Sequence, residues 1–149
     1  MSNTIILTVH NKEKTITKIL HALLNTISTQ TIKLIIILDG CTDNTPELLR
    51  KFLAINKTKL EIQIMITNNI WETRANNIGL KEVVTDYATI VQDDMLIKQK
   101  NWDKTLIRYL KKYPLFAVSG RAAHNFRFRN GNFEVVNLFG REYPFSSEN

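Results

Sequence analysis

Short apolar stretches alternate with segments of helical periodicity from residue 4 to about residue 120. The apolar stretches are rich in Ile, Leu and Val, and their length and branching favour β-strands. The predicted strands are 4–9, 32–38, 60–67, 87–91 and 115–119. The third of these alternates apolar and polar residues, so we expect it to be more exposed than its neighbours.

Amphipathic helices are predicted between these strands. Apolar residues recur at helical spacing from Ile16 to Ile27, and further helices are predicted from about Pro46, over 72–84 and over 101–112. Side chains suited to cap them are Asp43, Asn44, Thr45 and Asn101. Alternating strands and helices are typical of βαβ units, which predicts an α/β fold with a mostly parallel sheet flanked by helices.

The pattern changes after Gly120. Phe126-Arg127-Phe128-Arg129 alternates, Asn130-Gly131 is a two-residue turn signal, and 133–138 suits a returning strand. We therefore expect a C-terminal hairpin. The chain, 1–149, is expected to form a single domain, with a βα core over 1–120 and the hairpin and tail over 121–149.

The composition indicates a soluble globular protein. Of the 149 residues, 44% are hydrophobic and 23% are charged. No apolar stretch approaches the roughly 20 residues of a membrane span, and the N-terminus lacks the pattern of a signal peptide. Cys41 is the single cysteine, which excludes an internal disulfide and suits a reducing compartment. We therefore expect a cytoplasmic location and no transmembrane segment.

The chain is basic, with a formal net charge of +6 and a sequence pI near 9.5. This charge favours anionic partners such as nucleotide phosphates, nucleic acid or an acidic membrane surface. A lysine-rich solvated surface would give the same charge. Charge alone therefore does not select among these partners.

Acidic residues directly follow two of the apolar strands. Asp39-Gly40-Cys41-Thr42-Asp43 follows 34–38, and Gln92-Asp93-Asp94 follows 88–91. Such apolar runs are typical of strands buried on both faces of a parallel sheet. Because ligands of open α/β sheets bind beyond the carboxyl ends of the strands, we expect both clusters to face one cleft. Carboxylates there suit a hard divalent cation that also holds phosphates, which predicts a nucleotide-type ligand with a metal.

Four short motifs occur in the order of a known family. They are Thr8-Val9-His10-Asn11, Asp39-Gly40-Cys41-Thr42-Asp43, Asn76-Asn77-Ile78-Gly79 and Gln92-Asp93-Asp94. Over residues 4 to about 120 the chain resembles the nucleotide-sugar-binding domain of family 2 glycosyltransferases. The resemblance implies a Rossmann-like GT-A sheet and a nucleotide-sugar donor, with a UDP-sugar as the expected one.

The resemblance also implies roles for the residues of the two acidic clusters. Asp39 would accept a hydrogen bond from the imide nitrogen of uracil, a donor that cytosine lacks. Gln92 stands where the family has an acid that contacts the ribose, and an amide can still hydrogen-bond a hydroxyl. Asp93 would lie beside the sugar or metal. Asp94 would bind Mn²⁺ or Mg²⁺ between the diphosphate oxygens, where the metal offsets charge on the leaving group. A turn aspartate and a solvated acidic loop are the structural alternatives.

Other implied donor contacts lie at the first strand and the third helix. By position Thr8, His10 and Asn11 would line the base pocket, with His10 in place of an aromatic residue. Arg74 would reach the phosphates from the start of its helix, where anions are favoured. A structural histidine and a surface arginine are the alternatives. Cys41, where the family usually has serine, is interpreted as a small residue in a tight turn.

No catalytic base is assigned. Inverting members of the family use an Asp or Glu well downstream of the metal motif to deprotonate the acceptor. Only residues 95–149 follow here, so much of the usual acceptor-binding half is expected to be missing. Glu134, Glu142 and His124 have a suitable type but lie in no family motif.

Three hypotheses result. The first is a metal-dependent, inverting glycosyltransferase that transfers a sugar from a nucleotide-sugar to an unidentified glycan, protein or lipid acceptor. The second is a donor-binding module without its own transferase activity, whose acceptor side lies on another chain or a second subunit of a homo-oligomer. The third, ranked last, is nucleic-acid binding through the aromatic and basic residues of 126–129 and the basic segment 98–112.

Overall fold

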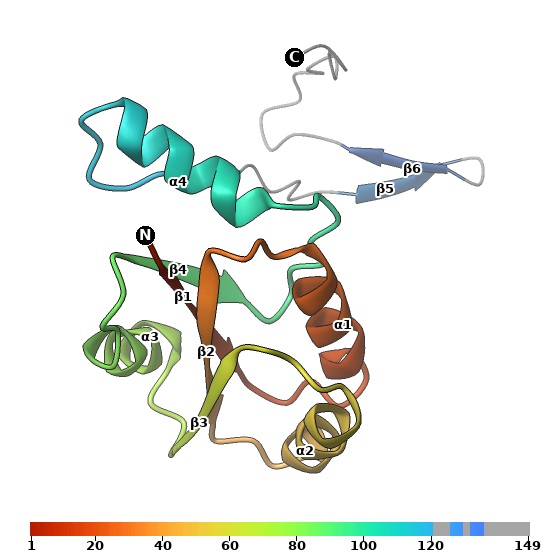
Figure 1. The fold of residues 1–149 in the computed structure, drawn as a ribbon. Helices are drawn as coiled ribbons and strands as arrows, with labels where there is room; N and C mark the ends of the chain where they lie inside the picture. Colours follow the sequence, from red (N-terminus) through yellow and green to blue (C-terminus); the bar gives the residue numbers. More distant parts are fainter. Residues whose placement is uncertain (121–125, 130–131, 136–149) are drawn as a thin grey trace. The chain divides into compact units, whose positions relative to one another are not determined.

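Four parallel strands in the order β3-β2-β1-β4 form the central sheet (Figure 1). This computed structural model describes residues 1–120, 126–129 and 132–135, and it divides the chain into two units, Met1–Phe116 and Ala117–Asn149. The elements of the first unit, in chain order, are β1 (Asn3–Val9), α1 (Ile16–Thr26), β2 (Thr31–Asp39), α2 (Thr45–Ile55), β3 (Glu61–Thr67), α3 (Glu72–Lys81), β4 (Tyr87–Gln92) and α4 (Trp102–Lys112). The predicted α/β fold with a parallel sheet flanked by helices is confirmed.

The strand register aligns the carboxyl ends of all four strands at one edge of the sheet. Val9 of β1 pairs with Leu38 of β2, Asp39 of β2 pairs with Thr67 of β3, and Thr8 of β1 pairs with Gln92 of β4. The loops that follow the strands therefore all start from this edge, which we call the strand-end edge.

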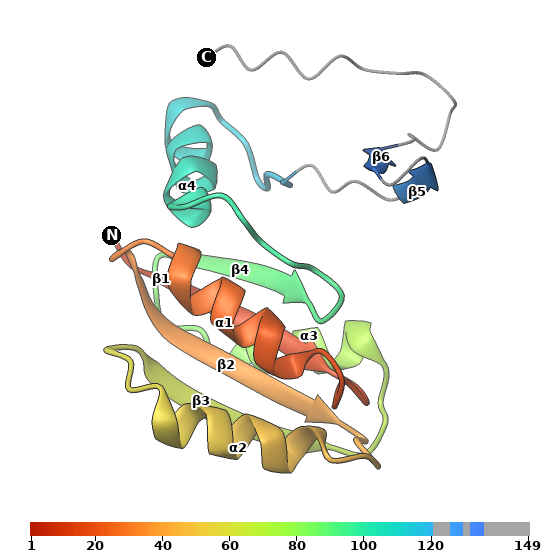
Figure 2. The same ribbon diagram turned by 90° about the vertical axis from the view of Figure 1, so that its right-hand side faces the viewer.

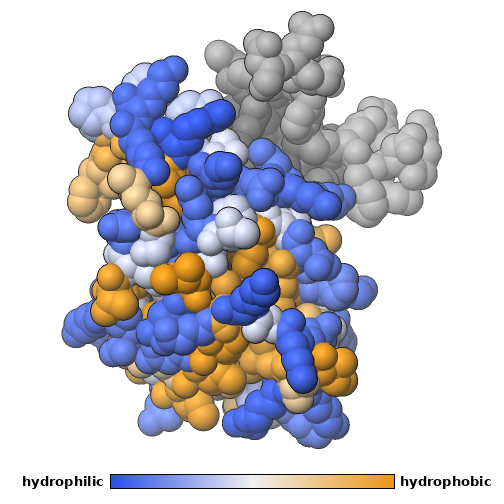
Figure 3. Space-filling view, viewed as in Figure 1, coloured by the Kyte–Doolittle hydropathy of each residue, from blue (hydrophilic) through white to orange (hydrophobic). Residues whose placement is uncertain are grey.

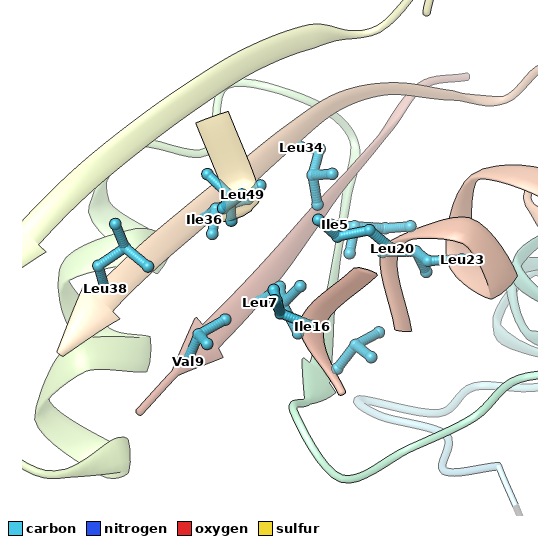
Figure 4. Close-up of a cluster of buried hydrophobic side chains, with 11 residues drawn as sticks. Ile5, Leu7, Val9, Ile16, Leu20, Leu23, Leu34, Ile36, Leu38 and Leu49 are labelled. Atoms are coloured by element: carbon cyan, nitrogen blue, oxygen red, sulfur yellow. The ribbon is translucent and has the colours of Figure 1, made fainter. Parts of the chain in front are cut away.

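Helices cover both faces of the two inner strands (Figures 1 and 2). On one face α1 and α2 pack on alternate residues of β1 and β2, and α3 packs on the intervening residues of the other face. The buried residues of the first face are Ile5, Leu7, Val9, Leu34, Ile36, Leu38 and Val91 from the sheet with Ile16, Leu20, Leu23 and Leu49 from the helices (Figure 4). Burial of each such side chain contributes about 1.5–3 kcal/mol, so this layer is the main source of stability.

The outer strands are more exposed. Ile66 of β3 and Ile90 of β4 are both exposed, and apolar side chains are visible over the sheet in Figure 3. The greater exposure of β3 was expected from its alternation. The prediction that the run before Gln92 is buried on both faces is wrong, because β4 pairs only with β1 in the described part of the chain and is an edge strand.

Helix α4 is fixed at the opposite end of the sheet from the strand-end edge. Asp103 is fully buried and accepts hydrogen bonds from the backbone amide of Ser28 at 2.9 Å and from the hydroxyls of Ser28 and Thr31 at 2.8 and 2.6 Å. Thr31 begins β2. The basic surface of α4 therefore lies at the starts of the strands, far from the acidic motifs.

Two local predictions near α4 are wrong. Asn101 occupies the cap position of the helix, but its side chain makes no capping hydrogen bond. Residues 115–119 do not form a strand. This stretch pairs with none of the described strands, and its Leu115 and Phe116 are exposed.

The second unit contains an antiparallel strand pair, β5 (Phe126–Arg129) and β6 (Asn132–Val135), with Phe128 opposite Phe133. The two strands of the predicted hairpin are therefore confirmed. The turn Asn130-Gly131, His124 and Glu142 lie outside the described residues, as does the end of the predicted returning strand.

Candidate functional site

Seven of the eight residues predicted to bind donor or metal lie at the strand-end edge. They are the last residues of strands or the first residues of the following loops: Thr8, His10, Asn11, Asp39, Gln92, Asp93 and Asp94. The eighth, Arg74, lies in the first turn of α3, which follows β3. The expected meeting of the two acidic motifs at one edge is therefore found in the structure, because β1 lies between β2 and β4 and its loop contacts both.

Asp39 is buried, with 2% of its surface exposed, and its carboxylate is held by the loop after β3. Oδ1 accepts a hydrogen bond from the Thr67 hydroxyl at 2.8 Å and from the Ile70 amide at 2.7 Å. Oδ2 accepts one from the Trp71 amide at 2.9 Å. Since a carboxylate oxygen can accept two hydrogen bonds, Oδ2 retains capacity for one further donor.

Gly40 allows the same loop to approach β2 closely. Its φ is +60°, and a Cβ at this position would lie 2.6 Å from the Cβ of Asn69. Asn69 and Trp71 also have positive φ, at 52° and 73°, a conformation that non-glycine residues rarely adopt. Trp71 is 76% exposed. Asp39 thus positions a loop of unusual conformation, a role that the sequence did not predict.

The loop after β1 is bound to the loop after β2 through His10 and Asn11. Nδ1 of His10 lies 2.6 Å from the backbone carbonyl oxygen of Asp39, so this nitrogen must carry a proton and donate. Asn11 Oδ1 accepts hydrogen bonds from the amides of Thr42 at 2.8 Å and Asp43 at 3.4 Å. Both residues are exposed, and both also have a structural partner.

Asp93 is paired within the protein, whereas Asp94 is exposed. Asp93 Oδ2 accepts a hydrogen bond from the His10 amide at 2.9 Å, and its Oδ1 lies 3.4 Å from Nζ of Lys12. Asp94 makes no hydrogen bond or ion pair with any described residue. Lys12 was missed by the sequence analysis, because a lysine in a loop carries no signal by itself.

Thr8 and Gln92 are linked to α3. The Thr8 hydroxyl donates to Asn76 Oδ1 at 2.7 Å, and Gln92 Nε2 donates to Glu72 Oε1 at 2.6 Å. Thr8 and Asn76 are both buried, and their hydrogen bond fixes α3 to β1. The sequence analysis also missed Glu72, although it had selected Gln92, whose side-chain amide donates to Glu72.

Arg74 and Cys41 differ in their surroundings. Arg74 is exposed and makes no hydrogen bond or ion pair with the residues that the structure describes.

The Cys41 thiol is partly buried and donates to the Val9 carbonyl at 3.4 Å. Burial is the largest cause and raises the pKa of this thiol. A hydrogen bond from the Asn11 backbone lowers it, and each nearby carboxylate raises it by a smaller effect. A protonated, packed thiol matches the interpretation of Cys41 as a small turn residue.

The donor set of the edge fits a hard divalent cation only in part. Within the described residues no group of three or more His, Cys, Asp or Glu side chains is arranged to hold a metal. Mg²⁺, however, is often bound through one or two carboxylates together with water and substrate phosphates. The exposed Asp94 and its neighbour Asp93 fit that mode, in which the nucleotide supplies part of the coordination.

The model of the family described as Glycosyl transferase family 2 matches residues 4–144. The chain belongs to this family. No curated protein sequence matches it. None of the helices in the described part of the chain has the length and apolar character needed to cross a membrane.

Solved structures of the S. aureus protein TarS have the same fold as this family 2 chain. One crystal structure of TarS has a TM-score of 0.61 at 22% identity, covering 75% of this chain and 20% of TarS. TarS 1-349 in complex with UDP gives 0.62 at 18% identity, and in complex with UDP-GlcNAc 0.61 at 19%. Each of these two matches covers 85% of this chain. The matched part is 40% of the TarS chain in the UDP complex and 39% in the UDP-GlcNAc complex. The chain thus spans less than half the length of these proteins, and the likeness establishes the GT-A fold.

Proposed function

We propose that this family 2 chain binds a UDP-sugar at the strand-end edge and takes part in transfer of the sugar with inversion, in a metal-dependent reaction. The observation that carries the proposal is the position of Asp39 and Asp94. One is buried beside an ordered loop and the other is exposed, at the same edge of the sheet. The complexes of TarS with UDP and UDP-GlcNAc support the choice of donor.

Asp39 is proposed to recognise the base. Its carboxylate is already fixed by three donors, so a further hydrogen bond from the uracil imide would require no loss of side-chain freedom. Cytosine and adenine have no equivalent N–H donor at the corresponding ring nitrogen, and guanine would have to fit a larger ring system into the same place. His10 and Asn11 would complete the edge of this base site.

Asp94 is proposed to hold Mn²⁺ or Mg²⁺ together with the diphosphate oxygens. A metal bound there stabilises the negative charge that grows on the leaving diphosphate. Asp94 suits the task because its carboxylate is exposed and unengaged within the described residues, unlike that of Asp93. Gln92 would reach a ribose hydroxyl from the end of β4 once its bond to Glu72 opens.

Direct displacement at the anomeric carbon needs a base on the acceptor side, and we assign none within the described residues. A donor-binding module that acts with another chain or a second subunit therefore stays the alternative. The chain spans 20% and 40% of the two TarS structures it resembles, so more than half of each of those structures has no counterpart in the matched region.

Calorimetric titration with UDP, GDP and ADP in Mn²⁺ tests the proposal. We expect UDP to bind and the two purine nucleotides to bind at least tenfold more weakly, because adenine lacks the N–H donor that Asp39 selects and guanine has a larger ring system. Equal affinity for the three nucleotides, or no binding of any, would contradict it. A second measurement, the release of UDP from a UDP-sugar, then distinguishes an active transferase from a binding module.

A further inference from the structure

Lys12 holds a cationic group inside the acidic strand-end edge. Its backbone is fixed, since the amide donates to the Thr45 hydroxyl at 2.7 Å and the carbonyl accepts from the amides of Thr15 and Ile16 at 2.9 and 2.8 Å. Its side chain is 31% exposed and reaches Asp93, which is 18% exposed. This ion pair is thus more sheltered than a pair of fully solvated side chains.

The surroundings of Lys12 are strongly acidic. The carboxylates that end or follow the strands, or that start α3, are Glu13, Asp39, Asp43, Asp93, Asp94 and Glu72. Of the ion pairs between described residues, the Lys12–Asp93 pair is the one at this edge. A diphosphate arriving here would be repelled by the carboxylates unless cations offset its charge. One bound divalent ion, Lys12 and the exposed Arg74 of α3 could together supply that charge.

We propose that the Lys12 ammonium acts as the counter-ion of Asp93 in place of a divalent metal. It pairs with Asp93 when the site is empty, and it moves to the diphosphate when the divalent metal and the donor bind. This inference rests on the proposed function and adds a specificity residue for the diphosphate to it. Lysine suits the exchange because its ammonium is a compact charge with three donors on a flexible stem, and it commonly binds phosphate as a point charge.

The exchange is expected because the carboxylate of Asp93 is already paired with Lys12. The carboxylate cannot serve the ammonium of Lys12 and a divalent cation equally, since two cations on one carboxylate repel each other. Without a ligand, Lys12 therefore competes with the metal for Asp93. With a diphosphate present, the ammonium would have a second anion within the same region, and Asp93 would be free to hold a divalent cation together with Asp94.

The test compares Lys12→Met with the wild-type protein and with Lys14→Met, an exposed lysine two residues along that has no bond to the acidic motifs. Three ligands are titrated: Mn²⁺ alone, UDP in saturating Mn²⁺, and uridine in saturating Mn²⁺. For Lys12→Met we expect Mn²⁺ alone to bind several-fold more tightly and UDP to bind about tenfold more weakly, the scale of one charged hydrogen bond. Uridine affinity should stay unchanged, and Lys12→Arg should restore UDP binding.

Opposite effects on Mn²⁺ and UDP are the signature of the exchange, because a purely structural role would weaken both or neither. Equal losses for UDP and uridine, or unchanged UDP affinity in Lys12→Met, would overturn the role of Lys12 while leaving the proposed function intact. Absence of UDP binding by the wild-type protein would overturn the proposed function itself. In that case tighter Mn²⁺ binding by Lys12→Met would still support the Lys12–Asp93 competition, and unchanged Mn²⁺ binding would overturn it.

Discussion

The carboxylate of Asp39 and the backbone amide of Trp71 are joined by a 2.9 Å hydrogen bond that connects the end of β2 to the start of α3. With the bonds to Ile70 and Thr67 it fixes the loop that carries the exposed Trp71 ring. Asp39, which is proposed to recognise the base, therefore also stabilises the loop that borders the proposed base site.

Replacement of Asp39 should reduce stability as well as nucleotide selectivity. Asp39→Ala leaves the Ile70 and Trp71 amides without their partner, and we expect a loss of about 2–4 kcal/mol in the free energy of unfolding, measured with urea. Glu47→Ala is a suitable control, because its exposed pair with Lys51 contributes little. A loss no larger than that of the control would contradict the loop-supporting role of Asp39.

Asp103 should be important for the attachment of α4. Asp103→Ala removes a fully buried carboxylate and leaves the Ser28 amide and the Thr31 hydroxyl unsatisfied. We expect a destabilisation of about 2–4 kcal/mol in urea unfolding. Lys104→Ala, at an exposed position on the same helix, should change stability by less than about 0.5 kcal/mol. Similar values for the two variants would show that α4 is held by other contacts.

Gly79 should not tolerate a side chain, because α3 lies directly on β1 at this position. A Cβ would come within 2.7 Å of Ile6 Cγ2 and 3.0 Å of Ile37 Cδ1. We expect Gly79→Ala to cost about 1–3 kcal/mol and to lower the melting temperature. Gly120→Ala is the matched control, since nothing lies within 4 Å of a Cβ there. An unchanged melting temperature for Gly79→Ala would contradict the close approach of helix and sheet.

Cys41 should react slowly with alkylating agents in the folded protein. Burial raises the pKa of its thiol, and the carboxylates of Asp43, Asp93 and Asp39 act in the same direction. Because the thiolate is the reactive form, the rate with iodoacetamide at pH 8 should be lower than for the same chain in denaturant, and it should rise at higher pH. Equal rates in folded and denatured protein would contradict this environment.

The sequence predicted the inner sheet well, because β1 and β2 are apolar on both faces and have the length of buried strands. The prediction failed where the exposure of a segment depends on how many strands pair with it. The run before Gln92 was interpreted like the longer and more apolar run before Asp39, yet β4 lies at an edge. Residues 115–119 pair with no strand of the described part of the chain. Periodicity reports the character of a segment but not the number of partners that surround it.

The candidate site was predicted at the level of motifs. Strand topology alone brings Asp39 and Asp94 to one edge, and the sequence order was enough to expect it. The partners of these residues were not predictable. Contacts such as Lys12–Asp93 and Asp39–Trp71 join loops whose conformations depend on positive φ values and on close packing at Gly40. A linear pattern carries no information on those geometries.

The role of Asp94 in metal-dependent UDP binding is the central claim. Its most direct test is calorimetric titration of UDP, with and without Mn²⁺, into the wild-type protein, Asp94→Asn and the control Asp86→Asn, which changes an exposed acid at the opposite end of β4. Wild type and Asp86→Asn should bind UDP at least tenfold more tightly with Mn²⁺, and Asp94→Asn should lose this gain. An Asp94→Asn variant that stays folded and keeps the full gain from Mn²⁺ would contradict the account.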